Sequence, residues 1–307
     1  MTGENEKRYS RPALVYHLIN LCTFFLYKFL KLFRSDKTIS GHARPLLITG
    51  LFRSGTTVTA RIINDMGFSS GPDEHLLKAI GSRKWSNPEG FLENHFFMEL
   101  SMYLFHKTNS WGDAPPSKKD IESVELTKTD DNKMVWFSMV ELHEDRISNV
   151  NKLKVQLSAS ASKPQNYLNR YFSGKSFIKN PHISVLLPYF KKIFPASEIL
   201  VVFRYPADAV KSARNVTPLA TMKLYELYYE ELCNEFRNGD KRIHFFSYDN
   251  LIEQPEASVS KLAAVLGVNQ IPKINYIKKK ISEESKEAVP DSTMSVYKFM
   301  LSNCINA

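Results

Sequence analysis

The segment Leu46-Leu47-Ile48-Thr49-Gly50 constrains the fold most, because it predicts a buried strand that ends in a glycine-rich turn. A short apolar run of this kind is typical of a strand that is covered on both faces. The turn continues as Leu51-Phe52-Arg53-Ser54-Gly55, and residues 56–66 then have a helical pattern. A strand, a glycine-rich loop and a helix in this order predict the first unit of a parallel sheet.

Strands and helices alternate along the rest of the chain. Further strands are predicted at residues 176–179, 198–203 and 242–247. Helical patterns occupy residues 133–147, 183–193, 207–214, 218–236 and 255–266. This alternation predicts an α/β fold of the P-loop type, a three-layer α/β/α arrangement with a central parallel sheet.

The domain organisation predicted from the sequence is simple. Residues 41–307 are expected to form one domain, preceded by a hydrophobic or amphipathic helical segment at 1–40. Residues 107–133 contain Pro115-Pro116 and many Asp, Lys and Ser, and they predict a long loop or a lid. A helical and loop region at about 94–175 is expected to shape a substrate site.

The loop at residues 50–57 predicts an anion site, because a glycine turn before a helix directs backbone N–H groups at a phosphate. A nucleoside-triphosphate loop requires Lys directly after its second glycine, followed by Ser or Thr for Mg²⁺. Here position 56 is Thr, and the cation is Arg53. The loop therefore argues against an ATPase or kinase and for a nucleotide with one 5′-phosphate and an attached group.

A second phosphate site is predicted where the strand at 198–203 ends. Arg204 follows this strand, and Ser212 lies about two helical turns further on. A guanidinium and a hydroxyl that converge at the carboxyl end of a strand suit a phosphate.

These two segments resemble the 5′-phosphosulfate loop and the 3′-phosphate motif of the sulfotransferases that use 3′-phosphoadenosine 5′-phosphosulfate (PAPS). The form Arg-Ser-Gly-Thr-Thr is similar to that of tyrosylprotein sulfotransferases and many bacterial sulfotransferases. Three further segments agree with bacterial members of the family: Asn87 to Asn94, Phe177 to Pro181, and Tyr248 to Leu251 with Gln254-Pro255. Asn180 stands where Asp is common in the family. The resemblance extends from about Pro45 to Val268.

The resemblance implies a role for each motif residue. The 5′-phosphosulfate would be held by Arg53, Ser54, Gly55, Thr56 and Thr57, and the 3′-phosphate by Arg204 and Ser212. Lys179 would stabilise the charge that develops on the leaving phosphate, with Arg53 beside it. The reaction would be direct in-line transfer of a sulfuryl group from PAPS to a hydroxyl or amine, without a metal.

A base is needed to take the proton of the acceptor. Glu74 is the first candidate, because its place resembles that of the catalytic glutamate of the tyrosylprotein enzymes. His75 is the second candidate, and Glu93 and His95 follow. His182 is a further residue that would face the acceptor.

Charge and composition exclude other classes of partner. The net charge of +9 suits an anionic ligand, but Lys and Arg are scattered rather than gathered in a stripe with aromatics, so no nucleic acid is expected. The three cysteines are far apart and predict no metal site.

Two functions remain as alternatives to a sulfotransferase. One is a nucleotide or small-molecule kinase, and the other is a catalytically silent nucleotide-binding protein at a membrane.

Residues 13–33 are rich in Leu, Phe and Tyr but contain Lys28 and Lys31. They predict an amphipathic helix that packs on the domain or contacts a membrane surface, with a single-span anchor as the alternative. A cytoplasmic location, with or without membrane association, is expected.

The acceptor is expected to be a small metabolite, because no additional recognition module is visible in the sequence. The oligomeric state is left open.

Overall fold

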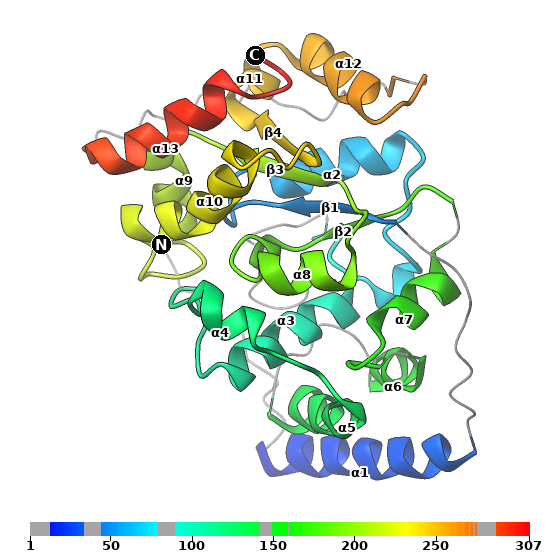
Figure 1. Cartoon of the computed structure of the whole chain (residues 1–307). Coiled ribbons are helices and arrows are strands. Elements are labelled where there is room, and N and C mark those ends of the chain that lie inside the picture. Colours follow the sequence, from blue (N-terminus) through cyan, green and yellow to red (C-terminus); the bar gives the residue numbers. More distant parts are fainter. Residues whose placement is uncertain are drawn as a thin grey trace, which may run out of the picture.

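The computed structural model describes residues 13–33, 44–78, 90–141, 149–158, 160–172, 174–269, 271–272, 274 and 287–307. Within these ranges a four-stranded sheet forms the centre of the fold (Figure 1). Its strands are β1 (Leu46–Thr49), β2 (Phe177–Lys179), β3 (Ile199–Phe203) and β4 (Ile243–Ser247). All of them pair in parallel in the order β2-β1-β3-β4. The predicted α/β class with a central parallel sheet is confirmed.

Both faces of the sheet are covered, because successive side chains of a strand point to opposite sides. Leu47 and Val201 join the larger core, which includes residues of α3 (His95–Lys107), α8 (Leu187–Ile193), α9 (Pro206–Ala213), α10 (Met222–Arg237) and α13 (Asp291–Ser302). Ile48 and Val202 join a second core with α2 (Thr56–Asp65) and α12 (Pro255–Val265). These are the three expected layers.

The strand order brings the functional segments to one edge of the sheet. β2, which follows β1 in the sequence, lies on one side of the central pair β1 and β3. β4, which follows β3, lies on the other side. In a parallel sheet such a change of direction opens a crevice at the carboxyl ends of the two central strands. The loop after β1 and Arg204 after β3 flank this crevice, and Lys179 ends the neighbouring strand β2.

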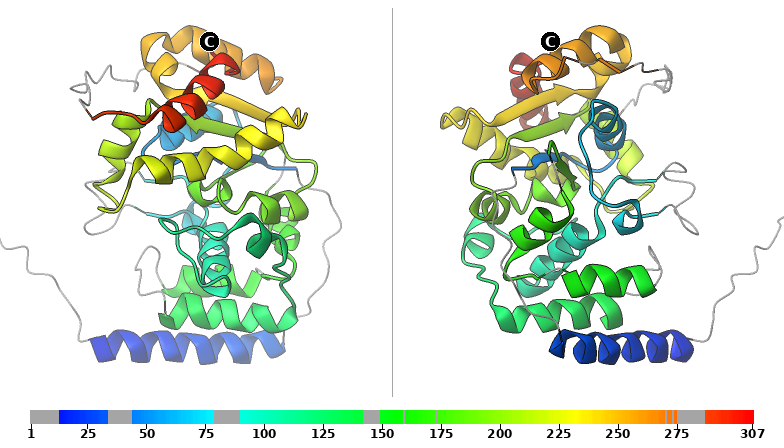
Figure 2. Two further views of the ribbon diagram at one scale, coloured as in Figure 1. Left: turned by 60° about the vertical axis from the view of Figure 1, so that its left-hand side comes forward. Right: turned by 90° about the vertical axis from the view of Figure 1, so that its right-hand side faces the viewer.

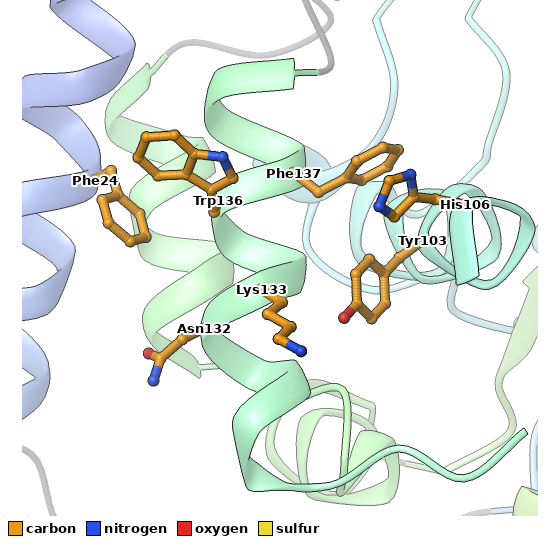
Figure 3. A pocket seen from close by; sticks show the side chains of 7 residues that line it. All are labelled: Phe24, Tyr103, His106, Asn132, Lys133, Trp136 and Phe137. Carbon is orange, nitrogen blue, oxygen red and sulfur yellow. The ribbon is translucent and has the colours of Figure 1, made fainter.

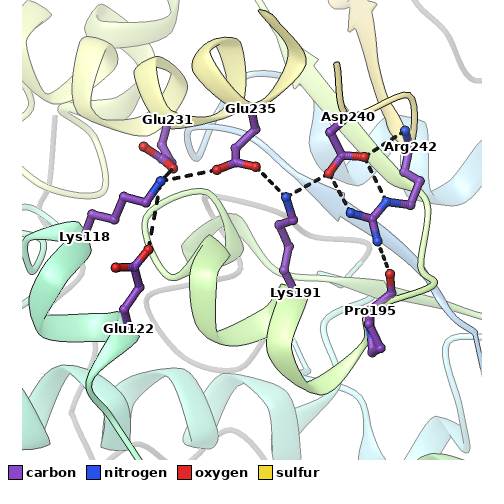
Figure 4. A network of polar contacts seen from close by, with 8 residues as sticks. All are labelled: Lys118, Glu122, Lys191, Pro195, Glu231, Glu235, Asp240 and Arg242. Carbon is purple, nitrogen blue, oxygen red and sulfur yellow. Dashed lines mark hydrogen bonds and ion pairs between the residues drawn. The ribbon is translucent and has the colours of Figure 1, made fainter. Parts of the chain in front are cut away.

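The prediction of a long loop at residues 107–133 is wrong, since α4 (Lys118–Glu122) and the start of α5 (Lys128–Trp136) lie there. Ile121 of α4 is buried in the larger core. Lys118 pairs with Glu231 and Glu235 of α10, and Lys191 of α8 extends the network to Asp240 (Figure 4). An apolar anchor and a charge network thus hold a segment whose polar composition suggested a loop.

The other helices fall close to their predicted positions, with one shift. The helix predicted at 133–147 begins earlier, as α5, and continues as the π-helical turn η3 (Phe137–Glu141). Residues 142–148 lie outside the described residues. Asp130 explains the earlier start, because its carboxylate accepts a hydrogen bond from the Thr127 N–H in a capping box.

Helices for which the sequence patterns gave no bounds complete the fold. They are α6 (Asn149–Ser158), α7 (Pro164–Tyr171) and α11 (Tyr248–Glu253), together with α3, α4 and α13. The helix α13, near the end of the chain, packs on α10, where Thr293 donates a hydrogen bond to Glu226.

The predicted amphipathic helix is present as α1 (Ala13–Leu32). It lies outside the three layers, at one end of the molecule, against α5 and α6 (Figures 1 and 2). Its contact is a small separate core in which Tyr27 meets Val135 and Met139. Across the described ranges, no helix combines the length and the apolar character needed to cross a membrane.

Candidate active site

The loop between β1 and α2 is held by close approaches that only glycine permits. Gly50, with φ of 135°, lies so near β3 that a Cβ atom there would overlap the Val202 carbonyl. Gly55, with φ of 91°, lies against the ring of Tyr248, which a Cβ atom would also overlap. Arg53 has φ of 72°, a left-handed conformation that is uncommon outside glycine. The loop is therefore a tight, fixed cradle.

Tyr229 of α10 supports this cradle from the sheet side. Its hydroxyl accepts a hydrogen bond from Leu51 N at 3.0 Å and donates to Val202 O at 3.0 Å. The Tyr229 hydroxyl oxygen also lies 3.1 Å from Ser54 Oγ, and Ser54 is fully buried. The side chain of Ser54 thus stabilises the loop, and its backbone N–H also donates within the loop, to the Leu51 carbonyl at 3.1 Å.

The start of α2 is suited to an anion. Gly55 is its N-cap, so no side chain caps the helix, and its first turn contains no acidic residue. The first N–H groups of a helix have no partner within it and carry partial positive charge. Thr56 and Thr57 begin this helix, and the Thr57 hydroxyl faces Lys179.

The two phosphate motifs meet at the crevice. Arg53 Nε donates a hydrogen bond to Ser212 Oγ of α9 at 3.2 Å, across 159 residues of sequence. Arg204 approaches the same place, with its guanidinium 5.6 Å from the centre of the Tyr248 ring. Burial lowers the pKa of Arg53, and the positive charge of Arg204 lowers it further, whereas Tyr248 has the opposite effect. Two cations held together in this way favour an anionic ligand.

Lys179 lies on the other side of the loop, buried at the end of β2. Its Nζ is 2.5 Å from Glu93 Oε1 and 3.1 Å from Thr57 Oγ1. The side chains of both Lys179 and Glu93 are more than nine-tenths buried. A buried cation next to the start of α2 can stabilise negative charge that develops there.

The candidate bases lie in different surroundings. Glu74 is exposed on the short turn η1 (Asp73–His75), whereas Glu93 is paired with Lys179. His75 is buried, with Nδ1 2.7 Å from the Tyr167 hydroxyl, and burial lowers its pKa. His95 is also buried, and its Nδ1 is 2.9 Å from Glu99 Oε1. Of these four, Glu93 is the one in contact with Lys179.

His182 follows β2 in the turn η4 (Pro181–Ile183). Burial, with a smaller contribution from Lys179, lowers its pKa to about 4, so the imidazole is neutral at pH 7. Its ring meets the edge of Phe105. Its Nδ1 is buried and has no hydrogen-bond partner among the described residues.

Asn180 stands where the resembled family commonly has Asp, and its contacts suit an amide. Its Nδ2 donates to the Phe97 carbonyl at 3.2 Å and to Ser101 Oγ at 2.8 Å, and its Oδ1 accepts from His182 N. A carboxylate cannot donate to the Phe97 carbonyl, so an amide fits this fully buried position. The substitution leaves Lys179 in place beside it.

The sequence patterns did not assign the residues that hold the site together. Tyr229 lies within a predicted helix, and Tyr248 was noted only as part of a family segment. Asp249 accepts a hydrogen bond from Tyr205 N at 2.7 Å, and so fixes the backbone after Arg204. These contacts join distant segments, and no local pattern reports them. Residues 87–89 of the Asn87 to Asn94 segment lie outside the described residues.

Comparison with known proteins decides the family. The model of the sulfotransferase family matches residues 45–272. The chain belongs to the sulfotransferase family. The predicted family is therefore confirmed, and it is a family of enzymes that use PAPS. No curated protein matches this sulfotransferase, and the described residues contain no group of His, Cys, Asp and Glu that could hold a metal ion.

Solved structures similar to this sulfotransferase are distant in sequence. The sulfotransferase domain of the Synechococcus PCC 7002 olefin synthase is 14% identical, with a TM-score of 0.45, and the match covers 87% of this chain and 98% of that one. The sulfotransferase domain of the curacin biosynthetic pathway is 13% identical, with a TM-score of 0.44 and coverage of 85% and 99%. Sulfotransferase STF9 from Mycobacterium avium is 16% identical, with a TM-score of 0.37 and coverage of 86% and 69%.

Replacing Gly55 with Ala should destabilise this sulfotransferase, because the new methyl group must displace the Tyr248 ring in a loop that also requires a positive φ. We expect the free energy of unfolding to fall by about 2–3 kcal/mol in urea titrations. Gly67→Ala is the matched control, since Gly67 has the same φ of 91° with open space around it. Its cost should be about 1–2 kcal/mol, that of a left-handed backbone conformation at a non-glycine residue. Equal losses in the two variants would contradict the assigned Tyr248 contact.

Replacing Asp249 with Asn should stabilise the enzyme at neutral pH. Burial raises the pKa of Asp249 from 3.8 to about 6, so its ionised form costs folding free energy above pH 6. We expect Asn to increase the free energy of unfolding by about 1–2 kcal/mol at neutral pH. The gain should shrink as pH falls through 6 and be lost near the unfolded pKa of 3.8. Urea titrations at several pH values test this, and a gain independent of pH would contradict it.

Proposed function

We propose that this chain transfers the sulfuryl group of PAPS to a hydroxyl or amine of a small molecule. The observation that carries the proposal is the contact between Arg53 and Ser212. It joins the loop expected to bind the 5′-phosphosulfate with the motif expected to bind the 3′-phosphate. One ligand with both groups, rather than two separate anions, suits such a joined site.

The residues at the crevice fit PAPS in charge and in hydrogen-bonding capacity. The uncapped start of α2 offers N–H groups at Gly55, Thr56 and Thr57, with Arg53 as the cation beside them. Arg204 and Ser212 would hold the 3′-phosphate, in keeping with the preference of guanidinium and hydroxyl groups for phosphate oxygens. When bound, PAPS would supply the sulfuryl group and a phosphate as leaving group.

Lys179 and Arg53 are proposed to stabilise the charge that the leaving phosphate acquires. Glu93 would hold the Lys179 ammonium group in position, because the two are paired at 2.5 Å in a buried environment. This pairing leaves Glu74, which is exposed, as the proposed base that accepts the proton of the acceptor. His75 remains the second candidate base.

The acceptor would be bound by the helical region at about 94–175. His182 adds support for an acceptor on this side, because its buried Nδ1 is unpartnered within the described structure and its ring contacts Phe105 of this region. A neutral imidazole can donate or accept a hydrogen bond from a hydroxyl or amine. The proposed acceptor class is therefore a small alcohol, phenol or amine.

Transfer assays test the proposed function. The full chain is incubated with PAPS and a panel of small alcohols, phenols and amines, and sulfated products and adenosine 3′,5′-bisphosphate are measured by mass spectrometry. We expect at least one acceptor to be sulfated, and Glu74→Gln to lower this rate about a hundredfold or more if Glu74 is the base. Phosphate transfer from ATP with Mg²⁺ would favour the kinase alternative. Bisphosphate binding without transfer would favour the silent nucleotide-binding protein.

A further inference from the structure

The outer face of α1 is an apolar surface that no other described helix or strand covers. Leu18, Phe25, Phe29 and Leu32 follow each other at helical spacing, with Cys22 in the same row. They lie opposite Tyr27, whose side chain is buried against α5 and η3. The exposed large apolar residues of this segment are Leu18, Phe25, Leu26, Phe29, Leu32 and Phe33.

The exposure of these residues is large for side chains of their size. Phe25 is 62% exposed, Phe29 is 57% exposed and Leu32 is 80% exposed. Isolated apolar side chains on a surface are ordinary, but a continuous row of aromatic and aliphatic residues marks an interaction surface. Figures 1 and 2 show α1 at the end of the molecule, with one side turned away from the other described helices and strands.

The inner side of α1 is firmly attached. Phe24 packs edge-on against Trp136 of α5, with 4.9 Å between the ring centres. The two rings form part of the wall of a hollow of about 330 Å³, which Tyr103, His106 and Phe137 also line (Figure 3). Because α1 is docked through one face, whatever binds its outer face would orient the whole domain.

The charge of this part of the chain indicates what covers the outer face. No acidic residue occurs in α1, and Lys28 lies exposed at the margin of the apolar row, over the Phe24 ring. The first 44 residues contain eight Lys and Arg against three Asp and Glu. Apolar rows flanked by basic residues suit the boundary between headgroups and acyl chains of an anionic membrane.

A second copy of the chain fits this face less well. The face of a 20-residue helix measures about 30 by 10 Å, well below the roughly 800 Å² that each partner buries in a stable complex. A second copy would also bring the same positive charges into contact. Insertion into a lipid surface does not require an interface of that minimum area.

We propose that the outer face of α1 inserts into the surface of an anionic membrane and holds the enzyme there. The inserted side chains are Phe25, Phe29 and their neighbours in the row, and the basic residues contact the anionic headgroups. Membrane docking is independent of sulfuryl transfer, because α1 lies outside the crevice that contains Arg53 and Lys179. A variant that fails to dock should therefore bind adenosine 3′,5′-bisphosphate as well as the native chain does.

Vesicle flotation of the full chain tests the proposal. Vesicles of phosphatidylcholine alone are compared with vesicles that also contain phosphatidylserine, at low and high salt. We expect binding to the phosphatidylserine vesicles that salt weakens, and a loss of roughly tenfold or more in Phe25→Ser/Phe29→Ser. Leu219→Ser/Val265→Ser, which removes two exposed apolar side chains elsewhere, is the matched control and should bind normally. Circular dichroism and bisphosphate titration verify that each variant is folded.

Cys22 provides a second measurement on the native sequence. It is exposed on α1, whereas Cys233 and Cys304 are buried, so a polarity-sensitive fluorophore can be attached at one place. Its emission should shift to shorter wavelength when phosphatidylserine vesicles are added. Absence of flotation, or flotation unaffected by Phe25→Ser/Phe29→Ser, would overturn the proposal. So would a concentration-dependent dimer in sedimentation velocity that the same double variant abolishes.

Discussion

Replacing Lys179 with Met should lower the rate of sulfuryl transfer by about a hundredfold or more, while binding of adenosine 3′,5′-bisphosphate changes little. The ammonium group lies beside the start of α2, 3.1 Å from the Thr57 hydroxyl, where charge on the leaving phosphate would develop. A group that acts mainly as the bond breaks affects kcat more than ligand affinity. Single-turnover rates and calorimetric affinities of the two proteins measure the difference.

The Lys179→Met variant also leaves Glu93 without its partner in a buried site. Removal of one partner from a buried ion pair costs about 3–5 kcal/mol of folding free energy, so lost activity could reflect lost structure. The double variant Lys179→Met/Glu93→Gln removes both charges and should regain most of the stability without regaining activity. Lys175→Met, exposed and two residues before the start of β2, is the control. Full activity in the double variant would contradict the proposed role of Lys179.

Replacing Arg204 with Ala should weaken the binding of adenosine 3′,5′-bisphosphate by roughly 10- to 100-fold. The guanidinium is held near the crevice by Asp208, at 3.5 Å, and by the ring of Tyr248. Its proposed partner is the 3′-phosphate, so adenosine 5′-phosphate, which lacks that group, should lose little affinity. Calorimetric affinities of the variant for these two ligands therefore distinguish the 3′-phosphate site from the 5′-phosphate site.

A general loss of positive charge is the alternative explanation for such a result. Lys241→Ala removes one exposed charge just before β4, at the opposite edge of the sheet from the crevice. It should leave both affinities nearly unchanged at moderate salt, because exposed charges are screened beyond about 10 Å. Parallel losses for the two ligands in Arg204→Ala would contradict the assignment of Arg204 to the 3′-phosphate.

The sheet could be predicted because each strand has a local signature. Buried parallel strands such as Ile199–Phe203 are continuous apolar runs, and the glycine turn after β1 identifies the edge at which a ligand would bind. The segment at 107–133 was predicted wrongly because its order comes from distant contacts. Lys118 pairs with residues of α10, more than a hundred positions away, and composition alone does not report such a partner.

The residues of the candidate site could be predicted in part, but the contacts between them could not. Arg53, Arg204 and Ser212 were predicted from motifs that follow strand ends, and Lys179 from the family resemblance; their roles stay proposals. Their arrangement could not be predicted, because the contact of Arg53 with Ser212 and the pairing of Lys179 with Glu93 depend on the order of the strands. The supporting hydroxyl of Tyr229 lies on a helix whose sequence gives no sign of a loop beneath it.

Calorimetric titration with adenosine 3′,5′-bisphosphate tests the central claim most directly, with adenosine 5′-phosphate and ATP with Mg²⁺ as comparison ligands. The joined crevice of Arg53, Ser212 and Arg204 predicts that the bisphosphate binds most tightly and needs no metal ion. Tighter binding of ATP with Mg²⁺ than of the bisphosphate would contradict the claim that this site is built for PAPS.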